Sequence, residues 1–99
     1  MKVSLLSPAA EEIARAIERQ RERAPEAARA LEAELDRSIG LIVENPLIGS
    51  VSPPDTRRVL LRRFPYSVVY RVLEDRLLVV AFAHHRRAPN YWTKRLSLA

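Results

Sequence analysis

The residues best suited to chemistry lie near the end of the chain, in the stretch AFAHHRRAPNYW at positions 81 to 92. This stretch contains both histidines, two arginines, the single tryptophan and one of the three tyrosines. Imidazole groups transfer protons near neutral pH, and guanidinium groups bind phosphates and carboxylates. Three interpretations are open: a catalytic cluster, a surface that binds nucleic acid, or the end of a strand that carries solvated charge.

The strand that leads into this stretch is predicted to separate the two histidines, because successive residues of a β-strand point to opposite faces of the sheet. In residues 76–84, RLLVVAFAH, the bulky set is expected to face the helices and the core: Leu78, Val80 and Phe82. His84 continues this face and is interpreted as a hydrogen-bonded residue at the edge of the core. His85 continues the opposite face and is the better functional candidate.

The spacing of potential ligands argues against a metal site. The histidines diverge, the chain has no cysteine, and the nearest acids, Glu74 and Asp75, lie at the far end of the same strand. No Ser-His-Asp constellation or glycine-rich phosphate loop is present either, since the chain has only two glycines. We therefore expect neither a metal nor a cofactor.

Two amphipathic helices are predicted before the strands. Residues 7–23 begin with Ser7 as the expected N-cap and Pro8 in the first helical position. Residues 25–45 begin at Pro25 and end at Asn45, because the residue before a proline avoids the helical conformation. Each helix has an apolar stripe at helical spacing, which is expected to form the core: Ala10, Ile13, Ala14 and Ile17 in the first, and Leu31, Leu35, Ile39 and Ile42 in the second.

Four segments have the composition of strands, being rich in Val, Leu, Tyr and Phe: residues 2–6, 57–64, 66–73 and 76–84. Residues 45–56 hold three prolines and a glycine and are predicted to form a loop, and residues 88–99 a short tail or helix. The predicted fold class is α+β in the order β-α-α-β-β-β. The N-terminal helical hairpin packs on one face of a small, mainly antiparallel sheet, and residues 1–99 form a single domain.

The sheet face away from the helices is predicted to be a shallow groove. In residues 66–73 the bulky side chains of Tyr66, Val68, Tyr70 and Val72 are assigned to the core. The small or polar side chains on the other face of both strands then line the groove: Ser67, Val69, Arg71, Val79, Ala81 and Ala83. This groove leads toward His85.

Charge is divided unevenly along the chain. Residues 1–56 contain seven Lys or Arg and ten Asp or Glu, a net charge of −3, whereas residues 57–99 contain ten and two, a net charge of +8. Such segregation indicates an acidic partner, either nucleic acid or protein. The absence of cysteine suits a reducing cytoplasm, and no apolar run reaches the ~18–20 residues of a membrane span or resembles a signal peptide.

The chain resembles the RelE/ParE superfamily of bacterial type II toxins. The resemblance rests on the element order, the helix opening SPAAEEI, and the segment RRFPYSVVYRV followed by HHRRAPNYW, and it covers nearly the whole chain. The pattern H-x-R-R-x-P-x-Y-W is most similar to the ParE branch, also called plasmid stabilisation proteins. This resemblance implies a cytoplasmic toxin that arrests growth and is held inactive in a complex with a cognate antitoxin.

The family resemblance implies one of two targets. ParE-like members poison DNA gyrase by binding it, so that no toxin residue has a chemical role, and this is the preferred interpretation. RelE-like members are ribosome-dependent endoribonucleases that cleave mRNA, which would require groups that neutralise the scissile phosphate and move protons: Arg71, His85, Arg86, Arg87 and Tyr91. RelE-type enzymes carry lysines before the second strand, and GSVSPPDT has none.

For gyrase binding, the expected contacts form a basic and aromatic surface: Arg62, Arg63, Arg86, Arg87, Tyr91, Trp92, Lys94 and Arg95. Trp92 has an equally plausible structural role, packing the tail onto the sheet. The antitoxin is expected to cover the helical hairpin and the groove. A third possibility is a non-toxic nucleic-acid-binding module, which is disfavoured because no strand repeats the aromatic residues that would stack on bases.

Overall fold

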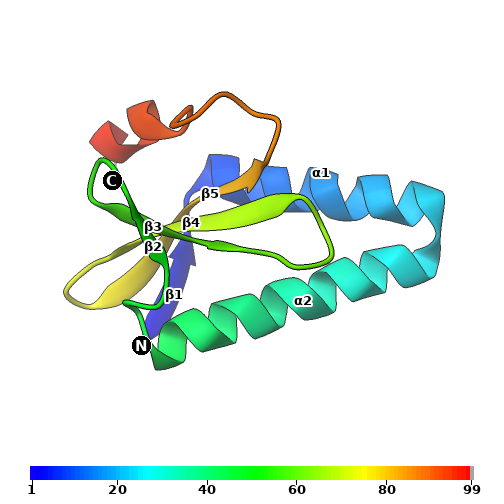
Figure 1. Ribbon diagram of the computed structural model, residues 1–99, viewed down its shortest axis with the longest axis horizontal. Coiled ribbons are helices and arrows are strands. Elements are labelled where there is room, and N and C mark those ends of the chain that lie inside the picture. The colour runs from blue at the N-terminus through cyan, green and yellow to red at the C-terminus, as the bar shows by residue number, and fades with distance from the viewer. Residues whose placement is uncertain (99) are drawn as a thin grey trace.

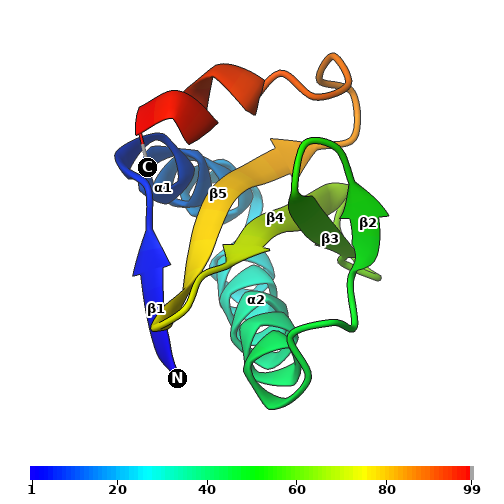
Figure 2. The same cartoon turned by 90° about the vertical axis from the view of Figure 1, so that its left-hand side faces the viewer.

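The computed structural model describes residues 1–98, which form two α-helices, a five-stranded sheet and a short 3-10 helix (Figure 1). The strands are β1 (Lys2–Leu5), β2 (Ser50–Ser52), β3 (Thr56–Leu60), β4 (Tyr66–Val72) and β5 (Arg76–His84). They lie side by side in the order β1-β5-β4-β3-β2, and only the β1–β5 pairing is parallel (Figure 2). The predicted α+β class and helical hairpin are confirmed. The predicted loop contains one further strand, β2, which pairs with β3.

The helical hairpin consists of α1 (Ser7–Arg23) and α2 (Pro25–Glu44). A single extended residue, Ala24, ends α1 and precedes Pro25, whose missing N–H suits the first position of a helix. Leu6, and not Ser7, is the N-cap of α1, so the predicted side-chain cap is wrong. The chain ends in the short 3-10 helix η1 (Thr93–Leu98). Within the described residues, neither helix is long and apolar enough to span a membrane.

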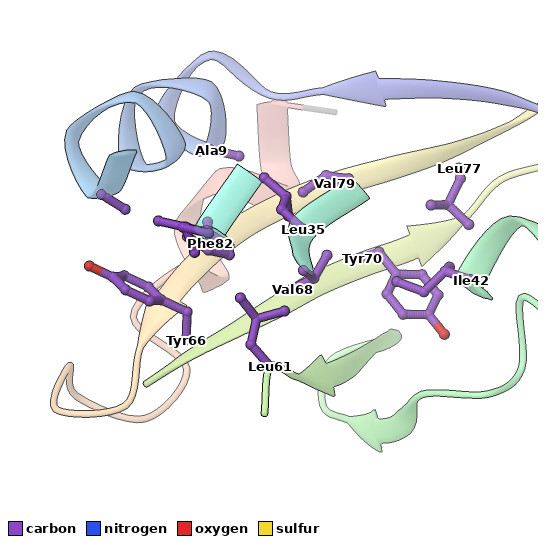
Figure 3. Close-up of a cluster of buried hydrophobic side chains, with 12 residues drawn as sticks. Ala9, Leu35, Ile42, Leu61, Tyr66, Val68, Tyr70, Leu77, Val79 and Phe82 are labelled. Carbon is purple, nitrogen blue, oxygen red and sulfur yellow. The ribbon is translucent and has the colours of Figure 1, made fainter. Parts of the chain in front are cut away.

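The main core lies between the sheet and the two helices (Figure 3). Tyr66 and Phe82 stack there with ring centroids 4.5 Å apart and planes 3° from parallel. The predicted stripe of α2 is confirmed, but that of α1 is rotated: Ala10 and Ala14 are exposed. The side chains of α1 that are buried are Ala9, Glu12, Ala16 and Gln20, with Ile13 and Ile17 partly buried. A carboxylate therefore occupies the inner face of this helix.

A β-bulge in β5 changes which of its residues face the helices. Val69 pairs with Ala81, but Tyr70 pairs with Val79, so Val80 is an extra residue in β5. Such an insertion reverses the alternation beyond it. Phe82 faces the helical core as predicted. The prediction that Leu78 and Val80 face this core is wrong, because both lie on the opposite face of the sheet. The prediction that Val79 lines the groove is also wrong, because Val79 lies in the helical core.

Two buried polar side chains hold the connections of the sheet in place. Glu34 of α2 accepts hydrogen bonds from the backbone N–H groups of Arg62, at 2.5 Å, and Arg63, at 3.2 Å. The hydroxyl of Tyr70 donates to the carbonyl of Pro46, at 2.7 Å, and accepts from the N–H of Gly49, at 3.0 Å. The links between α2 and β2 and between β3 and β4 are thus fixed from within the core.

The two glycines of the chain allow a matched test of this packing. A Cβ at Gly49 would lie 2.7 Å from the Tyr70 hydroxyl and 2.9 Å from the Arg58 carbonyl, whereas a Cβ at Gly40 has no neighbour within 4 Å. We predict that Gly49→Ala lowers the free energy of unfolding by roughly 1–3 kcal/mol through overpacking. Gly40→Ala, in the interior of α2, should raise it by roughly 0.5–1 kcal/mol. Urea denaturation measures both, and equal effects would contradict the Tyr70 contact.

Candidate functional site

The C-terminal segment, residues 88–98, covers the sheet face away from the helices. Trp92 is only 3% exposed and packs on Val69, Leu78, Val80, Ala81 and Ala83. Leu96 and Tyr91 lie against the same cluster. Much of the predicted groove is therefore filled by the chain itself, and Trp92 has the packing role considered for it. Trp92 Nε1 has no hydrogen-bond partner among the described residues. The hydrogen bonds that hold the segment on the sheet are therefore made by other residues of the segment.

A buried carboxylate, Glu12, fastens this segment. Its oxygens accept hydrogen bonds from the Tyr91 hydroxyl at 2.5 Å, from Arg95 Nη1 at 2.8 Å and from Arg95 Nη2 at 3.0 Å. The backbone N–H of Phe82 donates a further bond at 3.0 Å. Glu12 is 7% exposed, so it is held almost out of water by donors from β5 and from the C-terminal segment. The two hydrogen bonds from Arg95 to Glu12 form the bidentate pair that arginine commonly makes with carboxylates.

The position of Glu12 follows from the shortness of β1. That strand pairs with β5 only as far as Leu5 opposite Val79, so the edge of β5 beyond it lacks a neighbouring strand. Glu12 accepts a hydrogen bond from the N–H of Phe82, and Arg95 Nη1 donates to the carbonyl of Val80 at 3.1 Å. The two side chains thus satisfy backbone groups that an additional strand residue would otherwise bind. They also join α1, β5 and η1 at one point.

The pKa values of Glu12 and Tyr91 are both shifted by burial and by their hydrogen bonds. Burial is the largest single influence on the pKa of Glu12 and would raise it, but the hydrogen bonds from Arg95, Tyr91 and the Phe82 amide outweigh it, so the pKa lies below its ordinary value. Burial, and then the hydrogen bond to Glu12, raise the pKa of Tyr91 well above its ordinary value. The tyrosine therefore keeps its proton and donates it in the hydrogen bond to Glu12.

Beside the C-terminal segment lies a pocket of about 360 Å³ on the same face of the sheet. It contains His85, whose Nε2 is hydrogen-bonded to Ser67 Oγ at 3.2 Å. Arg87 also lines it, with its guanidinium carbon 3.8 Å from the centre of the Tyr91 ring and Nη1 3.8 Å from Glu12. Both side chains are exposed. The pocket thus combines an imidazole with an oriented positive charge.

The structure distributes the predicted ribonuclease residues over three places. His85, Arg87 and Tyr91 line the pocket just described. Arg71 lies at another pocket, where it pairs with Asp55 at 3.5 Å, and Arg86 lies on the helix side of the sheet. The five side chains therefore do not surround one reacting group. Across the described residues, no three His, Cys, Asp or Glu side chains are grouped so as to hold a metal.

The residues predicted to contact the target fall into two groups. Arg62, Arg63, Arg86, Arg87 and Lys94 are exposed, the first two in the loop between β3 and β4 and the others around the C-terminal segment. Tyr91, Trp92 and Arg95 are buried or half-buried and hold that segment in place. The predicted basic surface is thus divided: Arg87 and Lys94 are exposed on the packed aromatic segment, whereas Arg86 faces the helix side and Arg62 and Arg63 lie in a separate loop.

His84 lies where the sequence placed it, at the edge of the helical core. Its ring meets the edge of Tyr66, with centroids 5.1 Å apart, and its Nδ1 accepts a hydrogen bond from the N–H of Arg86 at 3.0 Å. Burial, followed by the positive charges of Arg86 and Arg19, lowers the pKa of His84. The imidazole is therefore held neutral beside arginines.

Glu12 is the site residue that sequence reasoning missed. The signal for it lay in the period of α1, because Ala9, Glu12, Ala16 and Gln20 share one helix face. A charged residue on a face of small residues indicates a buried ionic contact. Its partners could not be identified from spacing, since Tyr91 and Arg95 follow it by 79 and 83 residues.

The sequence model of the ParE toxin of the type II toxin-antitoxin system, parDE, matches residues 3–89. Among solved structures, the chromosomal ParDE toxin-antitoxin system from P. aeruginosa superposes with a TM-score of 0.71 at 19% identity, over 85% of this chain and 95% of that one. The isolated E. coli RelE toxin superposes with a TM-score of 0.59 at 17% identity, over 98% and 96% of the two chains. No curated protein sequence matches the chain.

The Glu12 contacts predict a specific acid sensitivity. Glu12→Gln keeps the shape of the side chain but leaves Arg95 buried without its carboxylate, so the free energy of unfolding at pH 7 should fall by roughly 3–5 kcal/mol. Because the pKa of Glu12 is lower in the folded protein than its ordinary value of 4.5, this stabilisation is present above that value and is lost as the pH falls through the folded pKa.

Urea denaturation between pH 3 and pH 7 measures this effect. Glu11→Gln, at an exposed neighbouring carboxylate, is the matched control and should change stability by less than about 0.5 kcal/mol. The difference between wild type and Glu12→Gln should shrink at low pH. A difference that stays constant over this range would show that the charge of Glu12 is not the source of the stability.

Proposed function

Because the chain belongs to the ParE toxin family of type II toxin-antitoxin systems, we propose that it arrests growth by binding DNA gyrase in the cytoplasm and that a cognate antitoxin neutralises it. The family match supports the toxin part of this proposal. The choice of a binding mechanism rests on one observation, the exposed Arg87 and Lys94 on a rigid support at the C-terminal segment.

The support fixes the positions of these charges. Arg87 lies on the face of the Tyr91 ring, and Tyr91 is bonded to the buried Glu12. Lys94 lies in η1, next to Arg95, and Arg95 is held by the same carboxylate. A surface that is ordered before binding loses less side-chain entropy on association than a mobile one. Its charge would also speed the encounter with an acidic protein or with a protein bound to DNA.

The same contacts weigh against RNA cleavage. A tyrosine that acts as a general acid must release its proton, but the Tyr91 hydroxyl donates to Glu12 and its pKa is raised. Arg71 is in a separate pocket from His85 and pairs with Asp55. Catalysis of phosphodiester cleavage needs these groups around one phosphate. The geometry therefore favours a toxin that acts by binding over an endoribonuclease.

An open apolar groove between α2 and β3 suits the antitoxin better than the predicted sheet groove. It has a volume of about 610 Å³. Leu41, Ile48 and Leu60 line it and are 50%, 48% and 55% exposed. Exposed apolar surface of this kind commonly marks a protein contact. Three arginines border it, Arg37, Arg62 and Arg63. An antitoxin segment with apolar and acidic side chains would match both features.

The target can be tested with purified components. We predict that the wild-type protein causes gyrase to leave cleaved plasmid DNA, and that Arg87→Ala combined with Lys94→Ala weakens this effect about ten-fold or more, because interface arginines commonly contribute over 1 kcal/mol. Arg29→Ala, on the exposed surface of α2, is the control and should act as wild type. Absence of gyrase poisoning together with mRNA cut on translating ribosomes would contradict the proposal and favour the RelE-like alternative.

The groove can be tested separately in cells. Leu41→Glu combined with Leu60→Glu should keep growth arrest but prevent rescue by the antitoxin encoded beside the toxin gene, because the new carboxylates would repel acidic side chains and remove apolar contact. Leu47→Glu, at a residue that is 65% exposed and outside the groove, is the matched control and should still be rescued. Full rescue of the groove variant would show that the antitoxin binds elsewhere.

A further inference from the structure

A second basic pocket, of about 320 Å³, lies on the helix side of the sheet, between α1 and the end of β5. Arg15 and Arg19 of α1 form one wall, and Arg86 and Arg87 form the other. His84 and Arg87 also border the pocket on the opposite face, and Arg15 also borders a hollow further along α1. Arg19 and Arg86 line neither of these other two pockets. Two arginine pairs that are about 70 residues apart in the sequence are thereby brought around one hollow.

Among the described residues, the positive charge of this pocket is not balanced by nearby acids. Its only acid is Glu12, whose oxygens are already bound by Arg95, Tyr91 and the Phe82 amide. Within residues 1–98, Arg15, Arg19 and Arg86 form no ion pair. The lowered pKa of His84, caused by burial and then by Arg86 and Arg19, agrees with an excess of positive charge here. Bringing several cations together without a counterion is unfavourable and indicates an anionic ligand.

The guanidinium of Arg19 and the backbone that carries Arg86 and Arg87 are held in place. Arg19 Nη1 donates to the Tyr66 hydroxyl at 2.8 Å, and Tyr66 is buried and stacked on Phe82. The turn that carries Arg86 and Arg87 is closed by their backbone N–H groups, which donate to His84 Nδ1 and to the His84 carbonyl, each at 3.0 Å. The pocket is thus preorganised to receive an anion from solvent.

The positive charge continues along α1. Arg15, Arg19 and Arg23 are four residues apart, so they lie on one side of the helix at steps of about 6 Å. All three side chains are exposed. A ligand with negative groups repeated along its length would engage both the pocket and this row.

We propose that this pocket and the arginine row bind the phosphodiester backbone of a nucleic acid. Guanidinium groups bind phosphate oxygens in a bidentate manner, and several of them converge here, whereas one carboxylate would offset only one charge. An acidic peptide would also need apolar anchors, but the aromatic residues of the pocket are covered: Tyr66 is 4% exposed and Phe82 2% exposed. Contacts of this kind are independent of base sequence. The site does not depend on gyrase being the target.

Fluorescence anisotropy with a labelled DNA duplex, in the absence of gyrase, tests the site. The variant Arg15→Ala with Arg86→Ala should lose about ten-fold or more in affinity, and the slope of log affinity against log salt should fall by about 2, roughly one for each phosphate contact removed. The control, Arg29→Ala with Arg76→Ala, removes the same charge outside the pocket and the arginine row and should keep most of the affinity. The charge-conserving variant Arg15→Lys with Arg86→Lys should keep part of the binding.

Two further arms identify the ligand. A labelled single-stranded RNA that shows the same dependence on Arg15 and Arg86 would support a backbone site shared by both nucleic acids. Poly-glutamate that binds as tightly as DNA, with the same dependence, would overturn the proposal in favour of an acidic protein partner. Equal losses in the two double variants, or no binding of DNA or RNA by the wild type, would also overturn it. None of these outcomes bears on gyrase inhibition, which is measured with gyrase present.

Discussion

A single buried carboxylate joins the parts of this protein that are far apart in its sequence. Glu12 accepts hydrogen bonds from β5, from Tyr91 and from Arg95, and so ties α1 to the sheet and to the C-terminal segment. Removing a carboxylate from water costs several kcal/mol unless its oxygens are bound by good donors. Here the donors come from β5 and from two residues of the C-terminal segment. The covering of the sheet face by Trp92 and the direction of Arg87 both depend on this cluster.

The positive charge of the C-terminal half is consequently divided between two faces. Arg86 and Arg87 are neighbours in sequence, yet Arg86 lines only the helix-side pocket and Arg87 borders both pockets. The face with the C-terminal segment presents charge on an aromatic support, which suits a protein partner. The helix side presents converging arginines without apolar anchors, which suits phosphates. A toxin that acts on an enzyme bound to DNA would have a use for both.

The elements of the fold were largely predictable because they depend on local patterns. Prolines at the helix starts and the alternation of apolar residues placed α2 and β5 within one residue of their observed bounds. The faces of β5 were not predictable, since the bulge at Val80 arises from its pairing with β4. The basic surface followed from charge segregation. The contacts of Glu12 that support this surface could not be predicted, because Glu12 meets Tyr91 and Arg95 only after the chain has folded.

Amide hydrogen exchange tests the role of Glu12 most directly. We predict that in Glu12→Gln the amides of residues 91–97 exchange markedly faster than in the wild type, while those of β4 keep their protection, because the segment would open locally without unfolding the sheet. Unchanged protection of residues 91–97 would contradict the role of Glu12 as the group that fastens the C-terminal segment.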